Sequence, residues 1–230
     1  MEKSQKFLNT IFKAQNVSGE AKPSLVFKAN LPHWQPLAAT FFVTFRLYGS
    51  IPNAILKDLI RQKEILLSVA GNNEEEKYNA HKRFFKLTDD YLDSNLNGPY
   101  WLSEKEILAI VKEGLHHREG KLYNLHAYCI MSNHVHLLID TLEDNTDYLY
   151  KIIQDFKKFT GREANIVLNR TGNSFWESEY YDHIVRDATE FFNILYYIYN
   201  NPVKANLVKS GKDWSGTYIS DAFVVRSIAD

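Results

Sequence analysis

Hydrophobic residues along this chain follow two patterns, one that predicts strands and one with the period near 3.6 that predicts helices. The strand pattern is rich in aromatic and β-branched residues and occupies residues 39–48, 125–131, 137–139 and, less regularly, 173–186. The helical pattern occupies residues 53–69, 103–117, 148–168 and 188–200, and a more polar helix runs from residue 73 and loosens at Asp93. We expect Asn201-Pro202 to end the last helix, because proline disfavours helical geometry at the residue before it.

The order of these elements is strand, helix, inserted helices, strand, strand, helix, strand, helix. Without the insertion it is the split βαββαβ order, which predicts an α+β, ferredoxin-like antiparallel sheet with helices on one face. Ligands would lie on the other, exposed face of the two central strands. We expect one domain over residues 1–230, with an irregular arm at 1–37, a helical insertion at 53–121 and a core at 122–208.

A β-hairpin at residues 122–140 carries the first candidate chemistry, because Ser132-Asn133 forms a turn between two apolar runs. His134 and His136 follow the turn and stand two residues apart on one strand. Their side chains therefore leave the same face of the sheet, about 6–7 Å apart. Two such imidazoles offer half of a divalent-metal site, although ordinary strand histidines that line a polar face would show the same spacing.

The helix at 188–201 offers groups that would complete such a site. Tyr197 and Asn201 are four residues apart and so lie on one helix face. The amide oxygen of Asn201 could be a third ligand, and mixed nitrogen and oxygen ligation suits Mg²⁺ or Mn²⁺ as well as Zn²⁺. Tyr197 would then lie near a metal-bound phosphate. The alternative is that the tyrosines of this helix are ordinary amphipathic packing.

Composition and charge limit the protein class without naming a partner. The chain is 45% hydrophobic, has a formal net charge of −1 and holds one cysteine, which excludes a disulfide scaffold. The total charge neither favours nor excludes binding to nucleic acid. Residues 151–170, however, hold five basic residues against two acidic ones. With no export signal and no apolar run of membrane-spanning length, we expect a soluble protein of the cytoplasm and no membrane partner.

Four segments together resemble the HUH single-tyrosine transposases and, within them, the group of REP-associated tyrosine transposases. They occur in the family's order and cover most of the chain outside the arm and the insertion. The pair of histidines alone is a weak signal, whereas the histidine hairpin followed about 60 residues later by the Tyr-x-x-x-Asn-Pro motif is specific. The segments are VTFRLYGSIP at 43–52, AYCIMSNHVHLLI at 127–139, SFWESEYYDHIVRD at 174–187 and YYIYNNPVKANLV at 196–208.

The resemblance implies a function and a role for each matching residue. His134, His136 and Asn201 match the metal ligands, and Tyr197 matches the catalytic tyrosine. Proteins of this family cut single-stranded DNA next to hairpin-forming repeats, with Mg²⁺ or Mn²⁺, and form a 5′-phosphotyrosine link and a free 3′-OH before strand transfer. Residues 122–208 would be the catalytic core, acting on the DNA of a bacterial nucleoid as a monomer or homodimer.

Side chains that would contact DNA are harder to assign. For phosphates the candidates are Lys157, Lys158, Arg162 and Lys204, for which a solvated helix face is the alternative. For base stacking they are Trp176, Tyr180 and Tyr181, for which packing on an edge strand is the alternative. The insertion at 53–121 departs from the short members of the family and leaves open how the protein binds DNA beyond its core.

Two other functions fit the same residues. One is a DNA-hairpin-binding module of regulatory role that has lost cleavage. The other is a metal hydrolase whose histidines activate water, for which Tyr197 would be dispensable.

Overall fold

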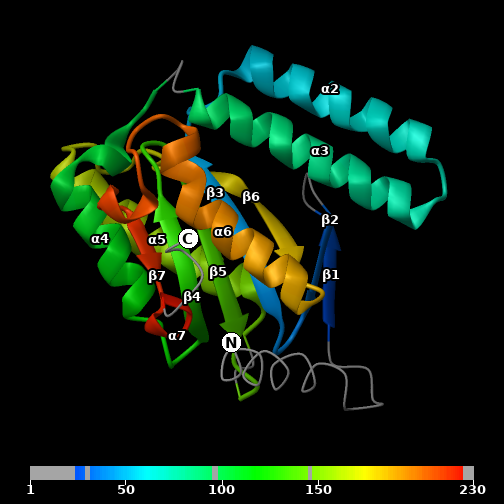
Figure 1. Cartoon of the computed structure of the whole chain (residues 1–230). Helices are drawn as coiled ribbons and strands as arrows, with labels where there is room; N and C mark the ends of the chain where they lie inside the picture. The colour runs from blue at the N-terminus through cyan, green and yellow to red at the C-terminus, as the bar shows by residue number, and fades with distance from the viewer. Residues whose placement is uncertain (1–23, 29–31, 95–97, 145–146, 225–230) are drawn as a thin grey trace.

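A five-stranded antiparallel sheet forms the centre of the protein (Figure 1). The computed structural model describes residues 24–28, 32–94, 98–144 and 147–224. In spatial order the strands are β6 (Trp176–Ile184), β3 (Thr40–Leu47), β5 (His134–Thr141), β4 (Tyr123–Ile130) and β7 (Thr217–Ile219). The first four have the predicted ferredoxin-like order, and β7 adds a short edge strand beside β4. The histidine-bearing strand β5 is therefore central.

Helices cover both faces of this sheet. On the first face lie α4 (Lys105–His116) and α5 (Leu149–Val167), which pack against alternate residues of β3, β4 and β5 such as Val43, Tyr128 and Leu137. On the second face lies α6 (Ala188–Lys204), packed on Phe42, Cys129 and Leu138. Each large side chain buried here contributes about 1.5–3 kcal/mol. The prediction that one face of the sheet is exposed is therefore wrong, because alternate strand residues are apolar on the second face too.

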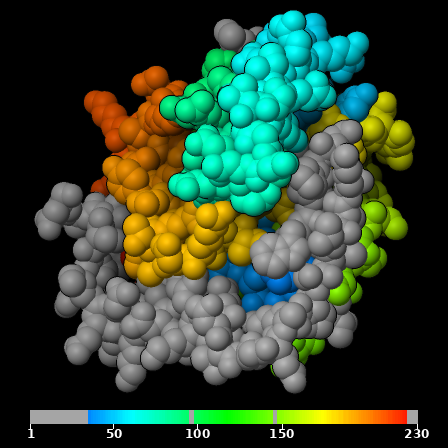
Figure 2. All heavy atoms as spheres, turned by 90° about the vertical axis from the view of Figure 1, so that its right-hand side faces the viewer, coloured from blue at the N-terminus to red at the C-terminus, as the bar shows by residue number. Residues whose placement is uncertain are grey.

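The first part of the predicted insertion at 53–121, residues 53–93, is a helical hairpin, which stands beside α6 over the second face. The last part of that range contains α4, which instead packs with α5 on the first face, where the two helices of a βαββαβ fold lie. The helices of the hairpin are α2 (Asn53–Ala70) and α3 (Glu74–Asp93). Gly71, at φ +55°, turns the chain between them, and the Asn73 side chain accepts hydrogen bonds from the first backbone N–H groups of α3. Phe85 of α3 packs on Phe42 of the sheet, and Figure 2 shows the hairpin seated against the segment of α6. A 3₁₀ turn, Trp101–Ser103, then leads into α4.

Part of the arm is regular, contrary to the prediction for residues 1–37. β1 (Ser24–Lys28) and β2 (Pro32–Pro36) pair as an antiparallel ribbon, while residues 1–23 lie outside the described part of the chain. The run Leu-Val-Phe in the first strand favours extended backbone, which the scattered prolines concealed. The Gln35 side chain attaches the ribbon to the sheet edge through hydrogen bonds to Tyr180 (2.7 Å) and Asp182 (2.8 Å).

Helix α6 continues past the predicted stop at Asn201-Pro202 and ends at Lys204. Pro202 lies in the last turn, where its missing N–H removes a single helical hydrogen bond. The turn still closes, since the Ala205 N–H donates to the Asn201 carbonyl (3.0 Å) and the Leu207 N–H to the Pro202 carbonyl (2.9 Å). A short helix, α7 (Asp221–Val224), follows β7.

Candidate functional site

The two histidines of β5 converge beneath α6 and α3, and neither is exposed to solvent. Their Nε2 atoms are 3.0 Å apart, while His134 Nδ1 lies 2.6 Å from Asn133 Oδ1 and His136 Nδ1 2.8 Å from Thr44 Oγ1. Each ring is thus oriented through Nδ1 and presents Nε2 to a shared point, as metal-binding imidazoles do. Burial, with the neighbouring His136, lowers the pKa of His134 to about 3, so this ring stays neutral with a lone pair available.

A carboxylate from the inserted hairpin meets these rings. Asp89 of α3 is buried, and its Oδ1 lies 3.2 Å from His136 Nε2 and 3.8 Å from His134 Nε2. These three side chains are close enough to share one metal ion. Two imidazole nitrogens and one carboxylate oxygen form a donor set that suits a divalent cation.

Tyr197 and Asn201 of α6 complete the cluster. The Tyr197 hydroxyl donates a hydrogen bond to Asp89 Oδ2, and the Asn201 amide nitrogen lies 3.4 Å from the same hydroxyl. Asn201 is 1% exposed, and its Oδ1 has no hydrogen-bond partner among the described residues. A buried amide oxygen without a donor is costly unless a cation or a ligand satisfies it, which supports its predicted role.

The electrostatics of the cluster keep the phenol protonated at rest. Burial and the adjacent Asp89 raise the pKa of Tyr197 well above its ordinary value. Burial would also raise the pKa of Asp89, but the charge of His136 and its hydrogen bond outweigh burial and hold that pKa low. Burial and the charge of Asp89 raise the pKa of Asp93, one helical turn further along α3, to about 6.

Lys204, predicted to contact phosphate, lies at the edge of the cluster. Its ammonium is 3.3 Å from Asp89, 2.7 Å from Asp90 and 3.0 Å from Asp93. It therefore joins the end of α6 to the end of α3. Sequence reasoning missed Asp89 and Asp93 because they belong to the segment interpreted as an insertion. The available signal was their spacing of four residues, which directs two carboxylates to one helix face.

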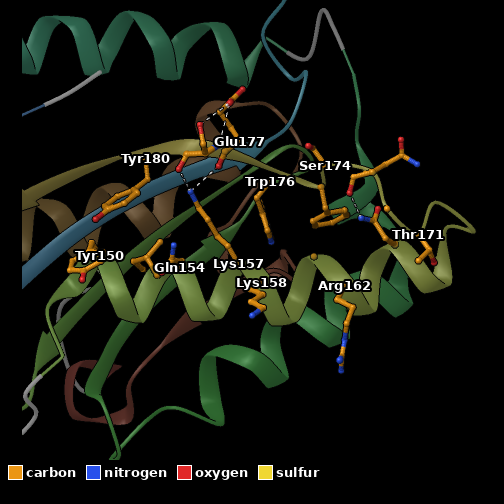
Figure 3. Close-up of a pocket in the computed structure, with 17 residues that line it drawn as sticks. Tyr150, Gln154, Lys157, Lys158, Arg162, Thr171, Ser174, Trp176, Glu177 and Tyr180 are labelled. Carbon is orange, nitrogen blue, oxygen red and sulfur yellow. Dashed lines mark hydrogen bonds between the residues drawn. The ribbon is translucent and has the colours of Figure 1, made fainter. Parts of the chain in front are cut away.

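Five of the predicted DNA-contacting residues gather elsewhere, in a groove of ≈ 580 Å³ between α5 and β6 (Figure 3). They are Lys157, Lys158, Arg162, Trp176 and Tyr180. The Lys157 ammonium donates to the backbone carbonyls of Glu177 (2.9 Å), Ser178 (3.1 Å) and Glu179 (3.3 Å), and burial lowers its pKa to about 7. The Trp176 N–H donates to Thr160 (2.9 Å). Lys157 and Trp176 therefore hold β6 against α5.

This α5–β6 groove lies on the first face of the sheet, away from Tyr197. In β6, Tyr180 pairs with Phe45, whose side chain belongs to the core under α4 and α5, and Tyr181 pairs with Thr44, which contacts His136. Because side chains alternate along a strand, these two neighbouring tyrosines lie on opposite faces. Of the predicted DNA-contacting residues, only Tyr181 and Lys204 share a face with the histidine cluster.

Comparisons with known proteins agree with the motifs. Residues 101–201 match the family model described as "Transposase IS200 like". The chain is 34% identical over 95 residues to a Haemophilus influenzae protein named "Putative REP-associated tyrosine transposase". The match covers 38% of this chain and 54% of that protein. The chain is 25% identical over 98 residues to a REP-associated tyrosine transposase of Escherichia coli, 42% of this chain and 54% of that protein. The matching stretch thus spans about half the length of these relatives.

A solved structure of a REP-associated tyrosine transposase bound to a REP hairpin matches with a TM-score of 0.48 and 14% sequence identity, over 88% of this chain and 94% of that chain. The sequence matches confirm the resemblance that the four segments indicated. Asp89 and the rest of α3 lie outside residues 101–201. Within the described residues, no helix has the length and apolar character needed to cross a membrane.

Proposed function

We propose that this chain, which is similar to the IS200-like and REP-associated tyrosine transposases, cuts and rejoins single-stranded DNA through a tyrosine nucleophile. Its substrate would be a strand next to a hairpin-forming repeat of bacterial DNA, bound by a monomer or homodimer. The observation that carries the proposal is the convergence of Tyr197 with two buried imidazoles and the Asp89 carboxylate.

The residues that would hold a divalent metal are His134, His136 and Asp89, with Asn201 offering its unsatisfied amide oxygen. When bound, Mg²⁺ or Mn²⁺ would supply a Lewis acid that neutralises charge on the scissile phosphate. The His134 ring needs no proton release before it binds a metal, because burial keeps it neutral at ordinary pH.

Tyr197 would act as the nucleophile and Asp89 as its proton acceptor. A phenol with a raised pKa is a weak nucleophile until a base takes its proton, and Asp89 Oδ2 already accepts the hydrogen bond from that hydroxyl. The Tyr197 oxygen attacks phosphorus, the bond from phosphorus to the 3′ oxygen breaks, and that oxygen leaves as a 3′-OH after it takes a proton. The 5′ phosphate remains esterified to the tyrosine.

Strand transfer is the reverse of this step with another 3′-OH as the nucleophile. The number of phosphate ester bonds does not change, so the reaction needs no external energy source. The role of the chain is to hold the reacting groups together.

A gel assay for a covalent protein–DNA band tests the proposal. Wild-type protein is incubated with Mg²⁺ or Mn²⁺ and a single strand that carries a hairpin from the gene's own flanks. We expect a metal-dependent band that Tyr197→Phe abolishes. The matched control is Tyr196→Phe, since Tyr196 is the neighbouring tyrosine and is 65% exposed on the outer side of α6. A band that persists in Tyr197→Phe and disappears in Tyr196→Phe would overturn the assignment of the nucleophile.

A second function, a DNA-hairpin-binding protein that does not cleave, is favoured by one observation. The histidines are fully buried and the Tyr197 hydroxyl is already engaged by Asp89, so in this arrangement a phosphate has no access to the two imidazoles. In the same assay this function predicts that hairpin DNA is bound and that no adduct forms with either protein. A metal hydrolase instead predicts cutting that survives Tyr197→Phe.

A further inference from the structure

A second groove, of ≈ 770 Å³, lies between α3 and α6 and reaches the nucleophile. Asp89, Tyr197 and Lys204 line it, so it shares side chains with the site itself. Its other walls come from the outer part of α3 and from the end of β6 and the start of α6. The volume is in the range of about 300–1,000 Å³ found for ligand sites in proteins. We call it the α3–α6 groove.

Basic side chains line both sides of the α3–α6 groove. Lys82, Arg83 and Lys86 stand on the exposed surface of α3, and Arg186 faces them from the turn before α6. No ion pair between described residues involves Arg83 or Lys86, and Lys82 is 4.0 Å from its nearest carboxylate, that of Glu190. These charges are therefore available to an anionic ligand.

The acidic side chains of the same groove have other partners. Asp187 accepts the hydrogen bond that caps α6, from the Glu190 N–H (2.9 Å). Glu190 accepts hydrogen bonds from the Tyr78 hydroxyl (2.7 Å) and the Arg186 N–H (3.0 Å), and it lies 2.9 Å from His183 Nε2. The repulsion that these carboxylates would exert on a phosphate is thus partly offset by donors already in place.

Aromatic rings lie between the basic residues and the nucleophile. Phe85 and Tyr181 stack with ring centroids 4.4 Å apart, and Phe85 lies 6.2 Å from the Tyr197 ring. Tyr78 lines the outer end of the groove. A row of basic groups that runs beside aromatic faces is typical of proteins that bind single-stranded nucleic acid, because phosphates meet the charges and bases stack on the rings.

We propose that the single-stranded part of the DNA substrate reaches Tyr197 along the α3–α6 groove, with its phosphates on Lys82, Arg83, Lys86 and Arg186. This inference rests on the proposed function. The rival path is the α5–β6 groove, which lies on the opposite face of the sheet and whose Lys157 is engaged by three backbone carbonyls. One wall of the α3–α6 groove is α3, which lies outside residues 101–201, so the helical hairpin supplies one wall of the substrate path.

Two matched pairs of lysine and arginine residues distinguish the two paths. Lys82 and Lys86 are four residues apart on the exposed surface of α3, and Lys158 and Arg162 are four residues apart on the exposed surface of α5. Each pair is changed to alanine in the Tyr197→Phe protein, which cannot form an adduct. The probe is a fluorescein-labelled oligothymidylate of about 20 nucleotides, long enough for a site of this kind. Binding is followed by fluorescence anisotropy across a series of salt concentrations.

We expect alanine at the α3 pair to weaken binding about tenfold. The slope of log Kd against log salt should fall by about 1.4, since each phosphate contact to a single strand contributes about 0.7. The α5 pair should change neither quantity. If alanine at the α3 pair leaves the affinity for the oligonucleotide unchanged, or if both pairs lose the same affinity, the groove assignment is wrong.

The outcomes also separate this inference from the proposed function. Suppose that the wild-type protein forms its covalent adduct, while the protein with alanine at the α3 pair binds the oligonucleotide as tightly as Tyr197→Phe alone. The proposed path is then wrong and the proposed chemistry stands. If the wild-type protein binds no single-stranded DNA and forms no adduct, the proposed function fails, and the path fails with it.

Discussion

Asp89 connects the two chemical parts of the site through its two carboxylate oxygens. One oxygen faces the imidazole pair, and the other accepts the hydrogen bond from the Tyr197 hydroxyl. A change at this one residue should therefore affect both metal binding and the reaction of the tyrosine. Asp58 of α2 pairs with Arg61 and belongs to neither of the described groups that are close enough to share a metal ion, which makes it a control of the same type.

We predict that Asp89→Asn weakens Mn²⁺ binding at least about tenfold. Removing a residue that only supports a metal ligand already costs about that much affinity, and Asp89 would be a ligand itself. The amide keeps the shape of the side chain and removes its charge, so the fold should persist. Isothermal titration calorimetry with Mn²⁺ measures the effect without any dependence on DNA cleavage. The control Asp58→Asn should bind Mn²⁺ like the wild type, and equal affinity in Asp89→Asn and wild type would exclude Asp89 as a ligand.

At the scale of the elements, α3 is attached to the core at both of its ends. At its C-terminal end, Asp89, Asp90 and Asp93 meet Lys204 of α6. At its N-terminal end, Tyr78 donates to Glu190, which also lies against His183 of β6. These two attachments hold the hairpin over the histidines.

We predict a pH-dependent loss of stability in Glu190→Gln. Burial alone would raise the pKa of Glu190, but hydrogen bonds with His183 and Tyr78 and from the Arg186 N–H outweigh burial and lower it to about 2. The ionised form is thus favoured in the folded state. Its stabilisation is fully present above the ordinary carboxyl pKa of about 4.3 and is lost as the pH falls towards 2.

In urea unfolding at pH 7 the Glu190→Gln variant should lose about 1–2 kcal/mol, after allowance for solvent screening of this partly exposed group. The deficit should shrink at pH 3. The control is Glu113→Gln, on the exposed side of α4. A deficit of equal size at both pH values would mean that the charge of Glu190 has no part in the attachment.

Helices α4 and α5 approach so closely at Gly114 that a side chain does not fit. An added Cβ would lie 2.8 Å from Thr160 Cγ2 and 3.2 Å from Phe156 Cε2. Thr160 has little freedom to turn away, because its hydroxyl donates to the Phe156 carbonyl (2.8 Å) and accepts from the Trp176 N–H (2.9 Å). The glycine therefore sets the spacing of the two helices.

We predict that Gly114→Ala lowers the free energy of unfolding by about 1–3 kcal/mol, the usual cost of overpacking. The matched control is Gly161→Ala in α5, where the nearest atoms to an added Cβ are 3.4 Å away. That variant should be neutral or gain up to about 1 kcal/mol of helix propensity. Chemical denaturation of both proteins measures the difference, and a fully stable Gly114→Ala would contradict this packing.

At the scale of the whole molecule, the candidate metal site joins three separate parts of the fold. The imidazoles come from the central strand, Asp89 from the inserted hairpin and Asn201 from α6. A ligand bound by all three stabilises the folded state alone, because the unfolded chain does not bring them together.

We predict that Mn²⁺ at about 100 times its Kd adds about 2.7 kcal/mol to the free energy of unfolding. For a chain of this length, that corresponds to a rise in Tm of about 5–10 °C. Differential scanning calorimetry with and without the metal checks it, and the His134→Ala/His136→Ala protein serves as the control. A rise of the same size in that double variant would locate the stabilising metal elsewhere.

Much of the fold follows from the sequence by itself, because the patterns that specify it are local. The period of the apolar residues determined the helices and the strands of the core, and the spacings of two and four residues determined that His134 and His136, and Tyr197 and Asn201, share a face. The ferredoxin-like order was predictable for the same reason, since few topologies fit that succession of elements.

Only the tertiary structure decided which elements meet. Asp89 lies more than a hundred residues before Tyr197, and no local pattern says that α3 packs over β5 rather than away from it. Tyr180 and Tyr181 are adjacent in the chain, yet the pleat of β6 assigns them to opposite faces, so that Tyr180 lines the α5–β6 groove and Tyr181 lines the α3–α6 groove. Contacts between distant segments depend on how whole surfaces fit, and that fit is settled when the core packs.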